Sequence, residues 1–283
     1  MKKLTINRIA VYLTLACNLR CKLCSVFSPY YKKPYHPLIE DLYRYIDRCF
    51  VILDDVNEFF VSGGEPLLRN DFHLFMNHLY NYYERISVVH LYTNGTIIPD
   101  TAAFESLEKW GEKLYVTIND YGPELSTNAL AVCQKLSNIQ NARIELRDYS
   151  TDDVYFGGWV DFGVSPLSEK HRKSDEYAKS VFQRCAIPQK LNFNFSIANG
   201  VLYPCTRMRA LVEQDIIKPS ECEAIDLFDK TLSDVDIRAK ITSLFSIEYM
   251  ASCVYCNGLC EDNERYTPAQ QFTDEEMKQI KRI

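Results

Sequence analysis

The chain has 283 residues, of which 47% are hydrophobic and 25% are charged, a composition typical of a globular protein with ample material for a core. The net charge of −6 argues against a general nucleic-acid binder, which would carry a strong basic excess. No apolar run approaches the roughly 18 residues that a membrane span requires, so we expect no membrane partner. Glycine is scarce, with 10 residues, whereas cysteine is plentiful, with 11.

An odd number of cysteines in a long chain is a poor fit to a small secreted disulfide scaffold. The stretch from Lys2 to Cys17 has some features of a lipoprotein signal. Arg8 interrupts it, however, and Thr14 stands where such signals usually carry leucine. We therefore expect a cytoplasmic protein whose thiols are reduced and available for metal or redox chemistry.

Strand and helix patterns alternate through the first half of the chain. Short runs rich in β-branched and aromatic residues predict strands at 9–15, 58–61, 86–92, 114–119 and 142–147. Amphipathic stretches between them predict helices at 38–53, 72–84, 101–109 and 126–136. Such repeats predict an α/β fold with parallel strands and right-handed crossovers, in which five or six units make a partial (β/α)5-6 TIM-like barrel. The loops after the strand carboxyl ends would then carry the site.

The alternation stops after about residue 148. The remaining sequence predicts a loop at 150–168, a charged helix at 169–184, and a β-hairpin from strands 191–197 and 201–203 joined by Asn199-Gly200. A cysteine-rich tail follows. We therefore predict a barrel domain at residues 1–165, extending at most to about 184, and a small Cys-rich C-terminal β-hairpin/helix domain at residues 185–283.

The spacing Cys17-x3-Cys21-x2-Cys24 is the central signal, and it falls in the loop after the first predicted strand. Three thiolates can hold one face of a cuboidal iron–sulfur cluster and leave one iron open, whereas clusters that only carry electrons normally have four protein ligands. A structural zinc site would need a fourth ligand, and His36 is the nearest candidate. The open iron would be free to bind a substrate or cofactor.

This spacing resembles that of the radical S-adenosylmethionine (radical SAM) superfamily. Gly63-Gly64-Glu65-Pro66 follows the second predicted strand, as the GGEP motif of that family does. Thr93-Asn94-Gly95 follows the third strand and Asn119-Asp120 the fourth, both at family-like places. The resemblance covers roughly residues 8 to 148.

The resemblance implies a set of roles. The three cysteines would bind a [4Fe-4S] cluster, whose open iron the amino and carboxylate groups of SAM would chelate. Leu23 would lie against the adenine, and Gly63, Gly64 and Glu65 would hold the methionyl amine. Asn119 and Arg147 are candidates for ribose and carboxylate contacts, the alternatives being a solvated strand end and a surface ion pair. Basic residues precede the first acidic residue, Glu40, and would offset the charge of cluster and cofactor.

The tail carries a second group of cysteines. Cys185 precedes the predicted hairpin and Cys205 ends it, while Cys253-x2-Cys256 is a chelating pair on a tight loop. The pattern resembles the twitch domain, a shortened form of the SPASM extension of radical SAM enzymes. It implies one auxiliary [4Fe-4S] cluster on these four cysteines, with a zinc site as the rival interpretation.

The match to the SPASM pattern is incomplete, because a full SPASM domain has seven cysteines and this tail has six. Cys260 is either a substitute ligand or a free thiol, and Cys222 is expected to be a bystander. Cys49 and Cys133 fall on helical patterns and are expected to be core thiols.

The resemblance predicts an enzyme that reductively cleaves SAM to a 5′-deoxyadenosyl radical, which abstracts a hydrogen from the substrate. We expect a radical SAM oxidoreductase acting on a small polar molecule, sugar- or aminocyclitol-like, with ferredoxin or flavodoxin as electron donor. The alternatives are a maturase that crosslinks or epimerises a peptide, and a non-enzymatic scaffold. Candidate pocket residues are Tyr30, Tyr31, Tyr121, Tyr149 and Trp159, and candidate proton acceptors are Asp120, Asp148 and Asp161.

Overall fold

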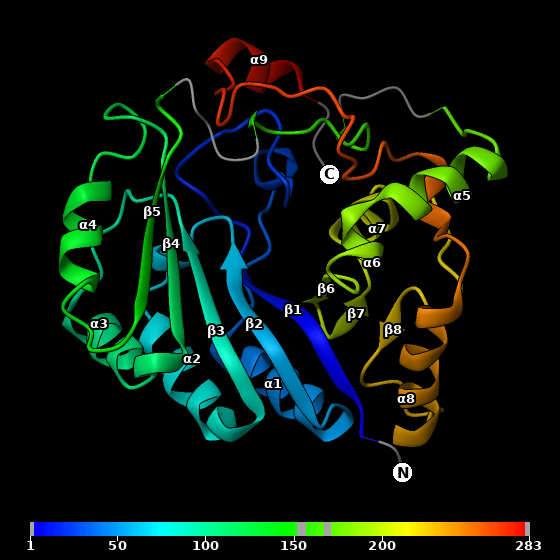
Figure 1. The fold of residues 1–283 in the computed structure, drawn as a ribbon, viewed down its shortest axis with the longest axis horizontal. Helices are drawn as coiled ribbons and strands as arrows, with labels where there is room; N and C mark the ends of the chain where they lie inside the picture. Colours follow the sequence, from blue (N-terminus) through cyan, green and yellow to red (C-terminus); the bar gives the residue numbers. More distant parts are fainter. Residues whose placement is uncertain (1–2, 152–156, 167–170, 281–283) are drawn as a thin grey trace.

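The computed structural model describes residues 3–151, 157–166 and 171–280, which form a mixed α/β fold (Figure 1). The strands are β1 Thr5–Thr14, β2 Asp55–Gly63, β3 Ile86–Thr93, β4 Leu114–Asp120, β5 Arg143–Asp148, β6 Phe195–Ala198, β7 Val201–Tyr203 and β8 Ile225–Asp226. The α-helices are α1 Ile39–Ile52, α2 Phe72–Leu79, α3 Thr101–Glu108, α4 Ala129–Leu136, α5 Asp175–Arg184, α6 Ala186–Gln189, α7 Thr206–Glu213, α8 Asp234–Ser243 and α9 Asp274–Gln279.

The eight strands form one sheet in the order β5-β4-β3-β2-β1-β6-β7-β8. Strands β1 to β5 are parallel neighbours, joined by the crossover helices α1 to α4. The sheet curves without closing, so the predicted partial barrel is confirmed (Figure 1). Within the described residues, no helix is long and apolar enough to span a membrane.

The side chains of β1 point alternately into the hydrophobic core and into the barrel interior. Ile9, Val11 and Leu13 are buried in the main hydrophobic core, which includes side chains of α1 and α2. The intervening Arg8, Ala10 and Tyr12 line an internal cavity instead. Because successive strand residues point to opposite faces, the same strand builds the core and presents a polar wall to the interior.

The tail hairpin extends the barrel sheet. Strand β6 pairs in parallel with β1, with Ile9 opposite Phe195 and Val11 opposite Ile197. Strands β7 and β8 then follow antiparallel. The Asn199-Gly200 turn has φ values of 49° and 76°, as a tight two-residue hairpin turn requires. The sheet is therefore continuous across the predicted domain boundary.

Several predicted elements differ in extent from those observed, and three of them are described here. The helix predicted at 72–84 is α-helical only to Leu79 and continues as a 3₁₀ helix over Tyr80–Arg85. The helix predicted from residue 169 begins at Asp175, where the Ser174 side chain caps it, and residues 169–170 lie outside the described residues. The strand predicted at 191–197 begins only at Phe195, because the two residues at 192–193 have φ values of 52° and 69°, which break an extended strand.

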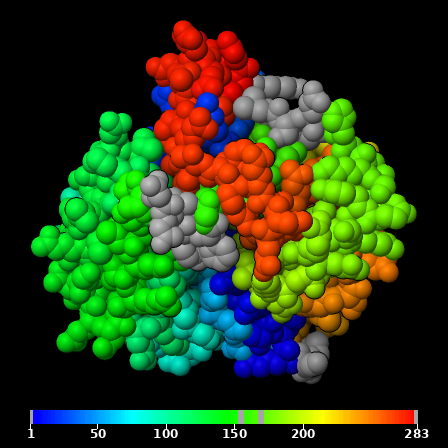
Figure 2. All heavy atoms as spheres, turned by 45° about the horizontal axis from the view of Figure 1, so that its top comes forward, coloured from blue at the N-terminus to red at the C-terminus, as the bar shows by residue number. Residues whose placement is uncertain are grey.

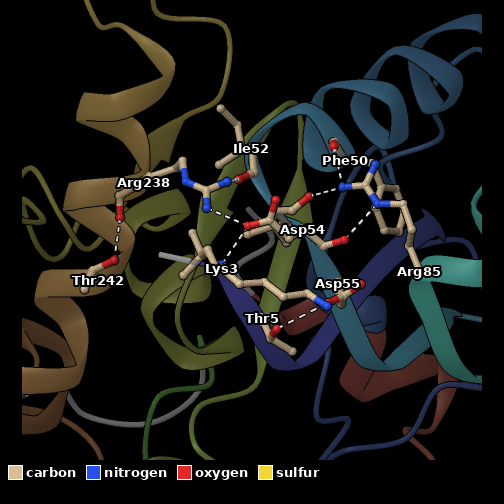
Figure 3. A network of polar contacts seen from close by, with 11 residues as sticks. Lys3, Thr5, Phe50, Ile52, Asp54, Asp55, Arg85, Arg238 and Thr242 are labelled. Atoms are coloured by element: carbon tan, nitrogen blue, oxygen red, sulfur yellow. Dashed lines mark hydrogen bonds and ion pairs between the residues drawn. The ribbon is translucent and has the colours of Figure 1, made fainter. Parts of the chain in front are cut away.

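A polar network fixes helix α8 beneath the amino ends of β1 and β2 (Figure 3). The Arg238 guanidinium lies 2.6 Å from an Asp54 carboxylate oxygen and donates a 2.6 Å hydrogen bond to the Ile52 carbonyl. The same Asp54 oxygen accepts a 2.7 Å bond from the Leu4 amide, and Arg85 donates to the Asp54 carbonyl at 2.7 Å. The network thus joins α8 to the end of α1 and to the barrel strands.

The segment at residues 266–276, here called the crossing segment, returns over the carboxyl ends of the barrel strands. Tyr266 pairs with Trp159, and Gln271 pairs with Cys21 in the loop after β1. Lys22 forms a 2.6 Å ion pair with Glu276 of α9. In Figure 2 this orange and red part of the chain lies across the middle and top of the face, with the blue loop visible beneath it.

Candidate cofactor and active site

The three clustered thiols lie together in the loop after β1. Cys17, Cys21 and Cys24 line one wall of an internal cavity of about 350 Å³. Burial, together with the charge of Cys24, raises the pKa of Cys17 to about 12. Burial also raises the pKa of Cys21, as do the charges of the other two thiols. The three sulfur atoms are therefore close enough to influence one another and face a shared space.

Two side chains from distant parts of the chain donate to these sulfur atoms. The Gln271 amide of the crossing segment donates to Cys21 Sγ at 3.1 Å, and the Asn94 amide after β3 donates to Cys17 Sγ at 3.7 Å. Such donors stabilise thiolates, the form in which cysteine binds metal. Gln271 was missed by the sequence reasoning, because nothing local marks a residue that pairs with one 250 positions away.

Gly63 and Gly64 are required by a close approach of backbone to backbone. A side chain at Gly63 would lie 2.0 Å from the Thr14 carbonyl oxygen, and one at Gly64 would lie 2.2 Å from that of Ala16. Gly63 also has a φ of 148°. Both glycines line the cavity. The end of β2 is thereby held against the start of the cysteine loop.

Glu65 lies behind this wall, and its side chain is fully buried. Its carboxylate accepts hydrogen bonds from the backbone N–H of Leu67 at 3.1 Å, the Thr93 hydroxyl at 3.0 Å and the backbone N–H of Asn94 at 2.7 Å. Burial raises its pKa to about 7. In the described structure Glu65 ties the end of β3 to the loop after β2, so contact with a cofactor amine stays a prediction.

The other residues predicted to contact the cofactor differ in whether they line the cavity. Asn119 lines the cavity, and its amide donates to the Thr93 carbonyl at 3.4 Å. Leu23 is half-buried and lies outside the cavity lining. Arg147 is likewise outside the lining, in an ion pair of 2.9 Å with Glu145. The structure therefore brings Asn119 to the cysteines, whereas the roles of Leu23 and Arg147 stay predictions.

Four tail thiols form a second group. Cys185 follows α5, Cys205 precedes α7, and Cys253 and Cys256 lie in and after a short 3₁₀ helix, Ala251–Val254. All four are buried. The pKa of Cys256 rises to about 12, first through burial and then through the charges of Cys205 and Cys185. Burial also raises the pKa of Cys253, with contributions from the other three thiols.

Two further tail cysteines differ in how near they lie to this group. Cys260 is buried beside Cys185, because a side chain at Gly258 would lie 3.0 Å from the Cys260 sulfur and 3.5 Å from the Cys185 Cβ atom, and its role as a ligand stays a prediction. Cys222 lies 3.4 Å from the Ser220 hydroxyl and lines a different cavity. Elsewhere, Cys49 is a buried core thiol and Cys133 is partly buried against the same core, as expected.

The donor chemistry of both groups suits a polynuclear cluster. In the described parts of the chain, no three or more His, Cys, Asp or Glu side chains converge closely enough to hold a single metal ion. Cysteine thiolates are the ligands of iron–sulfur clusters. They also bind structural zinc ions, so zinc at the tail thiols stays the rival interpretation.

The early basic residues are mostly engaged in ion pairs. Arg8 pairs with Glu58 at 2.8 Å, and Arg20 pairs with Asp274 at 2.5 Å. Their charges are thus partly neutralised by acidic residues from later in the chain. The offset of cluster charge by these residues stays a prediction.

The predicted proton acceptors do not reach the cavity. Asp120, Asp148 and Asp161 each accept backbone N–H bonds, from Gly122, Ser150 and Gly163 respectively, and so cap turns. Among the aromatic candidates, Tyr121 and Trp159 line the cavity with ring centroids 5.8 Å apart. Tyr149 packs against Tyr121 at 5.2 Å, and Tyr30 and Tyr31 lie outside this lining.

The chain forms a partial barrel whose first strand is followed by a three-cysteine loop. This loop faces a cavity at the carboxyl ends of the strands. Together these features define a class of cofactor-dependent barrel enzyme. The family model "Radical SAM superfamily" matches residues 11–154. The chain belongs to the radical SAM superfamily. Membership implies a [4Fe-4S] cluster and SAM as cofactors, which the cysteine loop and the cavity beside it would hold.

Curated relatives match less than half of the chain. The GTP 3′,8-cyclase of Sulfurovum sp. (strain NBC37-1) is 31% identical over 126 residues, which is 43% of this chain and 37% of that protein. The enzyme of the same name from Nautilia profundicola is 27% identical over 124 residues, with the same coverage. The match thus spans little more than a third of each relative.

Solved structures are similar over nearly the whole chain. BtrN in complex with AdoMet and 2-DOIA has a TM-score of 0.54 at 18% identity, covering 94% of this chain and 99% of that one. Native anSMEcpe with bound AdoMet and Cp18Cys peptide has a TM-score of 0.51 at 16% identity, covering 99% and 96%. At these identities the similarity concerns the fold.

Proposed function

We propose that this radical SAM enzyme oxidises a small polar molecule, with the help of an auxiliary [4Fe-4S] cluster on Cys185, Cys205, Cys253 and Cys256. The observation that carries the proposal is the second group of buried, mutually influencing thiols. The residues that follow Cys205, Thr206 and Arg207, line the same cavity as the first three cysteines. Both thiol groups are thereby connected to one cavity.

Each part of the chain has a defined task in this proposal. When bound, the cofactors would supply one-electron chemistry: SAM would provide the 5′-deoxyadenosyl radical that takes a hydrogen atom from the substrate, and the second cluster would provide an acceptor for one electron. The substrate would release the accompanying proton to water. The cysteine loop and Gly63-Gly64 hold the cofactor end of the cavity. Tyr121 and Trp159 form an apolar wall that excludes water from the reacting carbon.

A small substrate is favoured by the cavity. Its volume is about 350 Å³, and the cluster and SAM would take up part of it, which leaves room only for a small molecule. The crossing segment also covers much of the face above the strand carboxyl ends (Figure 2). The whole-chain similarity to BtrN, whose structure contains 2-DOIA, agrees with a small ligand.

A peptide substrate is the second candidate function. It is favoured by the similarity to anSMEcpe, whose structure contains a bound peptide. A peptide product modified by crosslinking or epimerisation would support this candidate. An oxidised small molecule, lighter by two hydrogens, would reject it.

Iron content tests the cofactor part of the proposal. Protein reconstituted without oxygen should contain about eight iron atoms per chain, the content of two cuboidal clusters. The double variant C253A/C256A should fall to about four, whereas the matched control C222A should keep about eight. About four iron atoms plus one zinc in the native protein would contradict the auxiliary cluster.

Activity tests the reaction. With dithionite as reductant, the native enzyme should cleave SAM to 5′-deoxyadenosine, and the yield should rise with the correct member of a panel of small polar molecules and peptides. Absence of SAM cleavage by protein with full iron content would reject the enzymatic proposal.

A further inference from the structure

Arg207, near the start of α7, is a buried cation without a counterion. Its side chain is only 7% exposed, and its Nε atom is buried without a hydrogen bond. In the part of the chain that the structure describes, Arg207 makes no hydrogen bond or ion pair. Its one polar contact is with the face of Phe162, whose ring centroid lies 3.5 Å from the guanidinium carbon.

An unpaired buried guanidinium is costly. A charge that leaves water without a partner loses much of its solvation free energy, and a single aromatic face returns only part of it. Buried arginines are therefore normally paired, as Arg69 is with Asp71 at 2.7 Å. The missing partner of Arg207 must be a group absent from the polypeptide described here.

The position of Arg207 indicates what that partner is. The side chain lines the same cavity as the three loop cysteines, Asn119 and Trp159. No carboxylate occurs among the described lining residues, so no acidic side chain of the cavity wall neutralises Arg207. A guanidinium with five donors in a planar fork suits a carboxylate or a phosphate, which it can bind through two parallel hydrogen bonds.

We propose, building on the function proposed above, that Arg207 binds an oxyanion of the substrate, a carboxylate or phosphate group. This contact would hold the substrate between the cysteine loop and the tail. Arg207 is thus a specificity-determining residue, and the substrate class narrows from polar molecules in general to anionic ones.

The auxiliary thiols are the competing partner. Arg207 follows Cys205 by two positions, and its charge lowers the pKa of Cys185 and Cys256. A cluster bound by those thiols would carry negative charge and would compete with a substrate anion for the Arg207 guanidinium. The experiment must therefore separate binding of an anion in the cavity from support of a cluster.

Calorimetric titration of the oxygen-free holoenzyme with SAM bound tests the inference. The probes are inorganic phosphate, succinate and the uncharged succinamide. Phosphate or succinate should bind saturably, and the one that binds identifies the anion. R207Q should weaken that binding at least tenfold, by loss of a charge-assisted pair, and R207K should weaken it less. The control R184Q removes a charge next to Cys185 from an exposed ion pair with Asp262, and should bind as the native enzyme does.

Three outcomes would overturn the inference. These are saturable binding of succinamide as tight as that of succinate, equal anion affinity in R207Q and the native enzyme, and absence of saturable anion binding. Loss of about half the iron in R207Q but not in R184Q would also overturn it, because the arginine would then serve the auxiliary cluster. SAM cleavage without anion binding rejects this inference alone, whereas anion binding without SAM cleavage rejects the proposed reaction.

Discussion

Individual residues in the barrel interior form a polar layer below the cavity. Glu145 on β5 accepts hydrogen bonds from Arg147, at 2.9 Å, and from Tyr115. His90 on β3 stacks against Tyr115, with ring centroids 4.0 Å apart, and its Nε2 lies 2.8 Å from the Thr117 hydroxyl. Burial and the nearby arginines lower the pKa of His90 to about 3, so it is neutral at pH 7. The layer thus supports the cavity floor with fixed charges only on Glu145 and the arginines.

Glu145 gives a pH-dependent contribution to stability. The hydrogen bond from Arg147 lowers its pKa from 4.5 to about 2. Since the folded pKa is depressed, the stabilisation is fully present above pH 4.5 and is lost as the pH falls toward 2. E145Q should lower the free energy of unfolding by about 1–3 kcal/mol at pH 6, and by much less near pH 3.

Urea unfolding of both proteins between pH 3 and pH 6 measures this difference. The matched control is E264Q, because Glu264 is exposed and bonded only to the Tyr266 hydroxyl among the described residues. A constant difference between E145Q and the native chain across this pH range would contradict the assignment.

At the scale of elements, contacts between distant segments fix the tail to the barrel. Arg238 on α8 reaches Asp54 and the Ile52 carbonyl beneath the barrel (Figure 3). Its side chain is 15% exposed, and that of Asp54 is 40% exposed. R238A should therefore reduce the free energy of unfolding by about 1–2 kcal/mol, more than an exposed ion pair contributes.

Thermal or urea unfolding of R238A checks this expectation. The control is R172A, because Arg172 forms an ion pair with Asp175 in which both side chains are at least half exposed. R172A should change the free energy by less than about 0.5 kcal/mol. Equal effects of the two variants would show that α8 is held by its apolar contacts alone.

The sequence predicted elements with strong local periodicity better than those set by distant contacts. The five barrel strands, the crossover helices and the Asn199-Gly200 turn follow from local pattern and turn chemistry. The pairing of β6 with β1 and the crossing segment could not be predicted, because their partners lie far away in sequence. Ser174 was a usable signal for the start of α5, since it is followed by two acidic residues.

In the candidate site, too, the sequence predicted features set by local spacing and missed features set by distant contacts. Cysteine spacing identified both thiol groups, since ligand loops are local. Arg207 follows Cys205 by two positions, yet only the fold shows that it is buried, has no ion-pair partner among the described residues, and lines the same cavity as the first three cysteines. The three aspartates considered as proton acceptors instead cap turns, a use that sequence alone does not distinguish from catalysis.

At the scale of the whole molecule, barrel and tail share one sheet and one core. Strand β1 is central only because β6 covers its second edge. The main core includes Ile9 and Val11 of β1 together with Phe195 and Ile197 of β6. We therefore expect the two predicted domains to unfold together.

Deletion of residues 185–283 tests this cooperativity. The shortened chain should expose the β1 edge and part of the core, and should aggregate or lack fixed packing. Gel filtration and near-ultraviolet circular dichroism measure these properties. Deletion of residues 266–283 alone is the control, since it retains β6 and should leave a monomer with native-like packing. A monomeric, cooperatively unfolding chain of residues 1–184 would contradict the expectation.

The crossing segment has a consequence for how the enzyme matures. Gln271 contacts Cys21, a residue that leaves the ribosome 250 positions earlier. The loop that receives iron and sulfide is thus accessible throughout synthesis of the intervening chain and becomes covered only at its end. Metal delivery would then precede the docking of the crossing segment onto the loop. A delivery protein that acts later would need the crossing segment to detach first.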